Sequence, residues 1–353
     1  MILMPDIHRN AQSVNELLAR QDFYASYLRK RSDAQFLKPL VIIAGASTTS
    51  HFENIEVESL SLKPLNVLMF TLKSRSLIKN LSLKPDSLVA GTPFQSFLSA
   101  LILKLFSPRA RIHTAIHGDL TALQKSGSVN FLKLLFLRLF INRSYSVRFV
   151  SKKQAAEAGN LIALKKVKTF IAPVPYRSPF VLGKKVKSSP SIAFVGRIQR
   201  ERGVEEWIEI VKPYDTKRLM IIGDGPLAGS MKSALQGAVF AGALTNREVQ
   251  GKWVEIGVLL STAPYESYGL AMREALLHGV PVVSRENAGA GELQQRYPDL
   301  IKLYKNMDQA QQYLHEFLEK PLNEEKFNIF RRDFFIEQEE SLNRLAEVWR
   351  NEI

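Results

Sequence analysis

Residues 258–283, VLLSTAPYESYGLAMREALLHGVPVV, contain in one run the alternation that decides the fold. An apolar stretch typical of a buried strand comes first, and a turn with Gly269 follows it. Apolar residues at helical spacing then lead to Gly279 and a second apolar stretch, and a glycine at such a place commonly ends a helix in the left-handed conformation. Strand, helix and strand in this order predict two parallel strands joined by a helical crossover.

The same alternation continues in both directions from this run. In the C-terminal half the expected strands are SIAFVGRI (191–198), RLMIIGDGPL (218–227), AVFAGAL (238–244), VLLSTAP (258–264) and VPVVSRE (280–286). In the N-terminal half they are MILMP (1–5), PLVIIAGAS (39–47), SLVAGTP (87–93), ARIHTAIHG (110–118) and YSVRFVS (145–151), with helices expected at 13–31, 94–106 and 130–140. The pattern predicts an α/β protein whose parallel sheets are covered by helices on both faces.

The length of 353 residues predicts two domains. A basic, Ser- and Pro-marked stretch between them predicts a linker at residues 176–190. We therefore expect one Rossmann-like domain at residues 1–175 and a second at 191–335.

The composition excludes several classes of protein. There is no cysteine, so disulfides, thiolate catalysis and cysteine-bound zinc are excluded, in agreement with a reducing compartment such as the cytoplasm. The N-terminus lacks a basic segment followed by a long apolar run, so no signal peptide is expected. No uninterrupted apolar stretch reaches the ~18 residues of a membrane-spanning helix.

The net charge of +14 is unevenly distributed along the chain. Residues 1–185 contain 27 Lys and Arg against 10 Asp and Glu, whereas the remaining residues are slightly acidic. FLSALILKLF (97–106) and FLKLLFLRLF (131–140) are apolar segments with isolated cations, either core helices or helices in a membrane interface. The basic half favours contact with an anionic membrane surface. Nucleic acid is not the expected partner, because no nucleic-acid module is recognisable.

Polar and glycine-containing segments follow several strands of the C-terminal half, at the edge where open parallel sheets bind ligands. A helix that starts near Gly269 directs free backbone N–H groups and its positive dipole end towards a bound phosphate. Arg197 and Arg202 can bind a diphosphate, and Glu266 can accept hydrogen bonds from sugar hydroxyls. Each of these residues alone, Glu274 included, is also consistent with an ordinary solvated surface.

As an ordered set, FVGRIQRERG, IIGDGPL, VFAGAL and ESYGLAMREALLHGVPVV resemble the donor domain of a retaining GT-B glycosyltransferase of the family 4 type (glycosyl transferases group 1), over about residues 191–292. The resemblance implies two Rossmann-like domains with parallel sheets facing across a cleft. It places the acceptor on residues 1–175 and the donor on residues 191–335, and implies that a final helix at 336–353 packs back on the first domain.

The resemblance also implies roles for individual residues. Arg197 and Arg202 would hold the donor diphosphate, with Arg202 in place of the family's usual lysine. Glu266 would contact the donor sugar, and Glu274 the nucleotide ribose. A cleft histidine of the family matches His117, so His117 and Glu266 are the candidate catalytic residues. The remaining candidate donor-binding residues are Gly196, Gly223, Gly242, Tyr268 (for a common phenylalanine), Gly269 and Leu270.

The implied activity is transfer of a sugar, with retention, from a nucleotide-diphosphate sugar to an acceptor hydroxyl. By family habit and by charge, the acceptor is expected to be a lipid-linked saccharide or oligosaccharide of cell-surface polysaccharide or glycolipid synthesis, reached from the cytoplasmic face of a membrane. No cofactor and no metal ion are expected, and the nucleotide sugar is a co-substrate.

Two alternatives stay open. The family's Gly-Gly loop after the first strand is missing, and His8, Arg9 and Asn10 stand in its place, which favours a catalytically silent scaffold subunit. An epimerase or dehydrogenase on two Rossmann-like domains is less favoured, because neither first strand is followed by G-x-G-x-x-G.

Overall fold

The structure is a computed structural model that describes residues 2–6, 11–30, 37–44, 51–60, 67–124, 127–165, 167–177, 191–320 and 322–352. The chain divides into two compact units. Unit 1 consists of Met1–Arg177 together with Gln338–Ile353, and unit 2 of Ser178–Glu337. Most of the expected linker, from residue 178 to 190, lies outside the described residues, as do His8, Arg9 and Asn10.

Unit 1 is built on a parallel sheet of seven strands in the order β3-β2-β1-β4-β5-β6-β7. The strands are β1 (Ile2–Asp6), β2 (Leu40–Ala44), β3 (Glu56–Leu60), β4 (Ser87–Ala90), β5 (Arg111–Ile116), β6 (Ser146–Phe149) and β7 (Lys168–Ile171). The helices are α1 (Ala11–Lys30), α2 (Val67–Asn80), α3 (Gln95–Phe106), α4 (Gly127–Phe140) and α5 (Lys152–Leu161), with 3₁₀ turns at Thr121–Gln124 and Ile141–Arg143.

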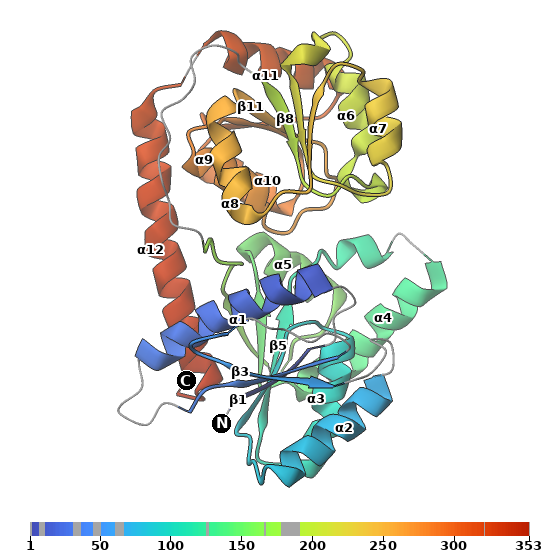
Figure 1. The fold of residues 1–353 in the computed structure, drawn as a ribbon, viewed down its shortest axis with the longest axis vertical. Helices are drawn as coiled ribbons and strands as arrows, with labels where there is room; N and C mark the ends of the chain where they lie inside the picture. The colour runs from blue at the N-terminus through green and yellow to red at the C-terminus, as the bar shows by residue number, and fades with distance from the viewer. Residues whose placement is uncertain are drawn as a thin grey trace. The chain divides into compact units, whose positions relative to one another are not determined.

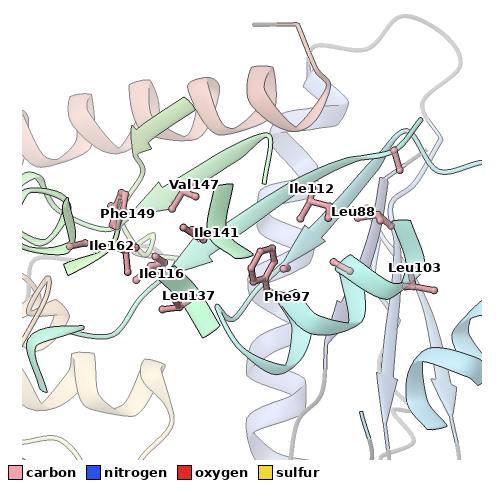
Figure 2. Packing of buried hydrophobic residues seen from close by; sticks show 14 of the residues in the cluster. Leu88, Phe97, Leu103, Ile112, Ile116, Leu137, Ile141, Val147, Phe149 and Ile162 are labelled. Carbon is pink, nitrogen blue, oxygen red and sulfur yellow. The ribbon is translucent and has the colours of Figure 1, made fainter. Parts of the chain in front are cut away.

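Helices cover both faces of this sheet, as the sequence predicts (Figure 1). Successive residues of a strand point to opposite faces, so Ile42 packs in one core and Val41 and Ile43 in the other. The first core lies under α2, α3, α4 and α5, and Figure 2 shows its central side chains, among them Phe97 and Leu137. The second core joins the sheet to α1 and to the end of α12 (Glu324–Trp349).

Unit 2 contains a parallel sheet of six strands in the order β10-β9-β8-β11-β12-β13. The strands are β8 (Ile192–Val195), β9 (Leu219–Ile222), β10 (Val239–Gly242), β11 (Val258–Ser261), β12 (Val282–Arg285) and β13 (Ile301–Tyr304). The helices are α6 (Val204–Val211), α7 (Ala228–Ala234), α8 (Asn246–Lys252), α9 (Leu270–Leu277), α10 (Ala288–Arg296), α11 (Met307–Glu319) and the first part of α12, with 3₁₀ turns at Arg200–Arg202, Thr216–Arg218 and Trp253–Glu255.

The predicted α/β fold with two parallel sheets is confirmed. Three strands lie beyond those named above, β3 and β7 in unit 1 and β13 in unit 2, and each is an outermost strand of its sheet. Among the described residues, no helix combines the length and the apolar character needed to cross a membrane.

Candidate functional site

The two central strands of unit 2, β8 and β11, lie side by side, and the strands that follow each of them along the chain are added on opposite sides of the sheet. From β8 the strands proceed outward through β9 to β10, and from β11 they proceed through β12 to β13. Such a reversal leaves a crevice outside the carboxyl ends of the central strands, which is the usual ligand position in open α/β sheets. A pocket lies there, and Arg202, Thr262, Glu266, Gly269 and Met272 are among the residues that line it.

Arg202 and Glu266 form an ion pair in this pocket, between Nη1 of the guanidinium and Oε2 of the carboxylate. The second carboxylate oxygen accepts a hydrogen bond from the backbone N–H of Gly269 at 3.2 Å. Thr262 Oγ1 donates to the carbonyl oxygen of Arg202 at 2.9 Å and so ties the arginine to the end of β11. The two paired side chains are 39% and 21% exposed, so a ligand in the pocket can reach both charges.

Gly269 is the N-cap of α9 and has a left-handed backbone with φ of 74°. A Cβ added there would lie 2.1 Å from Cε of Met272. Glycine therefore meets both the backbone requirement and the close packing at this turn. The N–H groups of the first turn of α9 lack partners within the helix, so this end of α9 favours an anion.

Glu274 lies in the second turn of α9 and is only 7% exposed. Its carboxylate makes no hydrogen bond or ion pair with any residue that the structure describes. Burial alone raises its pKa to about 7. A buried carboxylate without donors is costly, and the usual way to offset that cost is a partner that donates hydrogen bonds.

Three of the predicted glycines end neighbouring strands and bond to their surroundings through backbone groups. Gly196 donates to the carbonyl of Ile222 at 2.9 Å, and Gly223 donates to the carbonyl of Gly242 at 2.8 Å. A Cβ on Gly223 would lie 1.9 Å from the carbonyl oxygen of Gly196, so Gly223 is required by the packing of the two loops. A Cβ on Gly196 or Gly242 would meet nothing within 4 Å, so these two glycines border open space.

The other predicted donor-binding residues occupy different surroundings. Arg197 follows β8 and is exposed, and it is not among the residues that line the pocket. Leu270 is the first residue of α9 and is partly buried. The ring of Tyr268 is 9% exposed and packs under the guanidinium of Arg273, 3.7 Å from the ring centroid. Burial raises the pKa of Tyr268 to about 12, so its phenol is packed into unit 2 as a neutral group.

His117, the predicted catalytic histidine, lies in unit 1 directly after β5. Its Nδ1 is buried and has no hydrogen-bond partner among the described residues. Burial, reinforced by the charges of Arg148 and Arg20, holds the pKa of His117 well below its ordinary value. The imidazole is therefore neutral at physiological pH and can donate or accept a hydrogen bond without carrying charge.

The loop after β5 is held by Gln154 of α5. Its Nε2 donates to the carbonyl of Gly118 at 2.8 Å, and its Oε1 accepts from the backbone N–H of Val150 at 2.9 Å. Ser151 caps α5 by accepting from the N–H of Gln154. This network joins the ends of β5 and β6 and fixes the backbone next to His117.

Sequence reasoning missed two arginines that shape these surroundings. Arg148 is 3% exposed and donates to the carbonyl oxygens of Ala172 and Pro173 and to the hydroxyl of Tyr24. Arg273 lies over the ring of Tyr268. Neither arginine has a spacing that separates it from the many surface cations, so the sequence alone carried no signal for them. Among the described residues, no group of three or more His, Asp or Glu side chains is arranged to hold a metal ion.

Part of unit 2 is similar to a known family of proteins. The family model for glycosyl transferases group 1 matches residues 189–315, which include the pocket, α9 and the loops after β8 to β12. The resemblance predicted from the sequence motifs is thereby confirmed for this part of the chain.

Curated relatives align with about a third of this chain. One is an uncharacterized 41.2 kDa protein in the cps region of Klebsiella pneumoniae, 32% identical over 109 residues, which are 30% of each chain. Another is a GDP-mannose-dependent alpha-mannosyltransferase of Mycobacterium tuberculosis, 28% identical over 127 residues, 32% of this chain and 33% of the relative. This chain thus covers only about a third of the length of these relatives.

Solved structures share the fold over the whole chain. The structure of Anabaena HepE in complex with UDP-glucose has a TM-score of 0.72 at 15% identity, covering 100% of this chain and 99% of the other. Sucrose-phosphate synthase from Thermosynechococcus elongatus has a TM-score of 0.76 at 13% identity, with coverage of 99% and 98%. The GT-B fold class is confirmed by these similarities.

Proposed function

We propose that the protein is a retaining glycosyltransferase that moves a sugar from a nucleotide-diphosphate sugar to an acceptor hydroxyl. The observation that carries the proposal is the arrangement along α9. An exchangeable ion pair lies at the start of the helix, and the unpartnered, buried carboxylate of Glu274 lies in its second turn. A nucleotide-diphosphate sugar supplies what each part lacks, namely phosphate for the cation and hydroxyls for the carboxylates.

Donor binding is expected to exchange the partners of the Arg202–Glu266 pair. The diphosphate takes the guanidinium of Arg202, since phosphate accepts two parallel N–H bonds from an arginine. Glu266 is then free to accept hydrogen bonds from hydroxyls of the donor sugar while Gly269 still holds its other oxygen. Binding of the diphosphate and binding of the sugar therefore depend on each other. When Arg202 turns to the diphosphate, the hydroxyls of the sugar stabilise the Glu266 carboxylate that has lost its arginine partner.

Glu274 is proposed to bind the ribose of the nucleotide. Two vicinal hydroxyls are suited to one carboxylate, since each donates a hydrogen bond to one oxygen. These bonds favour the ionised form, so they oppose the effect of burial on the pKa of Glu274.

The transfer step itself is proposed to rely on electrostatic stabilisation. Arg197, Arg202 and the N-terminal end of α9 would stabilise the charge that develops on the departing diphosphate. Attack on the face that the diphosphate leaves would retain the configuration, with a donor phosphate oxygen accepting the acceptor's proton. His117, as a neutral group, would hydrogen-bond a hydroxyl of the sugar or of the acceptor. The proposed reaction requires no metal ion and no cofactor.

The partners are proposed from charge and from similarity. Curated relatives are named as GDP-mannose-dependent enzymes and a similar structure contains UDP-glucose, so both bases belong in a test. The basic residues 1–185 support attachment to the cytoplasmic face of an anionic membrane, where a lipid-linked saccharide for cell-surface polysaccharide or glycolipid would be the acceptor. A lipopolysaccharide galactosyltransferase, WaaB, is among the proteins with a similar fold, at a TM-score of 0.68 and 14% identity.

A calorimetric panel of UDP, GDP, ADP and their common sugar conjugates tests the donor assignment. We expect binding of one nucleotide series by the wild type, loss of that binding in Glu274→Ala, and unchanged binding in Glu209→Ala, a control at an exposed glutamate of the same unit. No binding of any of these ligands to folded protein would overturn the proposal. Donor binding without transfer to any acceptor would identify a scaffold subunit, and interconversion of the donor without an acceptor would identify an epimerase.

A further inference from the structure

Helices α2, α3 and α4 cover one face of the sheet of unit 1 and lie next to one another (Figure 1). Thr71 of α2 donates to Ser99 of α3 at 3.0 Å, and the rings of Phe97 in α3 and Phe136 in α4 are 5.8 Å apart. The inner side of each helix contributes to the core of unit 1, as Phe97 and Leu137 in Figure 2 illustrate. The sides of the three helices that point away from this core lie on the outside of the unit, and they are called the outer face here.

This outer face is unusually apolar. Of the seventeen large apolar side chains that are exposed among the described residues, eleven belong to α2, α3 or α4. Six of these are more than half exposed, namely Leu68 (59%), Leu105 (76%), Val129 (64%), Phe131 (61%), Leu132 (61%) and Leu139 (63%). Scattered exposed leucines are ordinary on a protein surface, whereas such a concentration on adjacent helices marks a contact surface.

The charges on the same helices all have one sign. The sequences of α2, α3 and α4, which the structure describes throughout, contain no aspartate or glutamate. Their cations are Lys73, Arg75, Lys79, Lys104, Lys133 and Arg138. Three of these cations bind neutral oxygens, which leave their charge uncompensated: Lys104 donates to Ala110 O at 2.6 Å, Arg138 to Leu161 O at 2.8 Å and Lys133 to Asn130 Oδ1 at 3.4 Å.

We infer that the outer face of α2, α3 and α4 docks on an anionic lipid bilayer. The apolar side chains enter the boundary between headgroups and acyl chains, and the long basic side chains extend to the phosphates. The combination favours lipid over a second copy of the chain, since a symmetric pair would bring the same cations of both copies together. The inference rests on the membrane association proposed above, names the surface responsible for it, and is independent of the sugar-transfer reaction.

The test is co-sedimentation of the full chain with vesicles of phosphatidylcholine alone and of phosphatidylcholine mixed with phosphatidylglycerol. We expect binding to the mixed vesicles that decreases with salt. The triple variant Leu105→Gln/Leu132→Gln/Leu139→Gln should lower the partition coefficient by about tenfold or more, because it removes apolar groups from the inserted face. Thermal unfolding of the variant should match that of the wild type, since all three side chains point to solvent.

A matched control changes three exposed apolar residues elsewhere, Met307→Gln/Ile329→Gln/Ile336→Gln, and should bind vesicles like the wild type. The inference is overturned if mixed vesicles do not bind the protein, or if the face variant and the control bind them equally. It is also overturned if the chain dimerises without lipid and the face variant is monomeric, because the face would then bind a second copy. Calorimetric donor binding, measured without vesicles, reports separately on the transferase proposal.

Discussion

Replacing Glu274 with glutamine is expected to stabilise the protein while it weakens donor binding. The pKa of Glu274 is about 7 in the folded protein against an ordinary value of 4.5. Between these two pH values the folded state therefore keeps a proton on Glu274 that the unfolded state has lost. A carboxyl group whose pKa is raised by folding stabilises the folded state at a pH below its unfolded pKa. That contribution is lost as the pH rises through its folded pKa. Relative to neutral glutamine, the wild type is therefore destabilised by about 1 kcal/mol at pH 5 and about 3 kcal/mol at pH 8.

Urea unfolding at pH 5 and pH 8 measures this difference. Trp207 and Trp253 are fully buried in unit 2 and Trp349 lies in the core of unit 1, so the fluorescence is read in a Trp349→Phe background to follow the unit that contains Glu274. The variant Glu209→Gln is the control, because Glu209 is exposed, and it should show no comparable gain at either pH. A stability difference between Glu274→Gln and wild type that does not grow with pH would refute the assignment of Glu274 as a buried carboxylate without partners.

The same substitution tests the ribose contact. Glutamine offers one acceptor oxygen and no charge, so donor affinity should fall by about 10- to 100-fold. For the wild type, donor affinity should decrease as pH falls below 7, since the ligand hydroxyls bind the ionised carboxylate. Unchanged affinity in the variant would refute the contact even if the stability result agrees.

Three further predictions concern the other residues. Arg202→Ala should weaken binding of the nucleoside diphosphate by about 10- to 100-fold in calorimetry, because a charge-assisted contact is lost, and unchanged affinity would contradict its role. Gly269→Ala should destabilise unit 2 by about 1–2 kcal/mol, since alanine is strained at a φ of 74°, and an unshifted melting curve would count against the strain. His117→Gln should retain donor binding but lower the transfer rate at saturating donor by about 100-fold. At saturating donor, where the titration of Glu274 no longer limits binding, the wild-type rate should show no ionisation near pH 6.5; either a normal rate in the variant or such an ionisation would exclude a neutral catalytic imidazole.

The sequence predicts every inner strand but misses some of the outer strands, for a physical reason. Central strands such as β2 are buried on both faces and form continuous apolar runs. The edge strand β3, with the sequence EVESL, is mostly exposed, so neither an apolar run nor a clear alternation indicates a strand there. Strand β13, with the sequence IKLY, also lies at an edge, where its partly exposed positions allow polar residues.

In the candidate site, the features that depend on neighbouring residues in the sequence are predictable, and those that depend on distant residues are not. Gly269 and Glu266 follow from the local chemistry of a turn before a helix, which spacing reveals. The pairing of Glu266 with Arg202 joins residues 64 positions apart and depends on β8 lying beside β11. Likewise, spacing does not reveal that the phenol of Tyr268 is buried under Arg273, or that Glu274 lacks a partner. These features arise from packing, which a single sequence does not display.

The proposed activity depends on a nucleotide sugar binding to unit 2 with its ribose on Glu274. A double-mutant cycle tests it most directly, by calorimetry of the preferred nucleoside diphosphate and its 2′,3′-dideoxy analogue on wild type and on Glu274→Ala. Loss of the hydroxyls should weaken binding to the wild type by about 10- to 100-fold and leave binding to the variant nearly unchanged. Equal losses in both proteins would show that the hydroxyls and Glu274 do not interact, and would refute the proposed ribose contact.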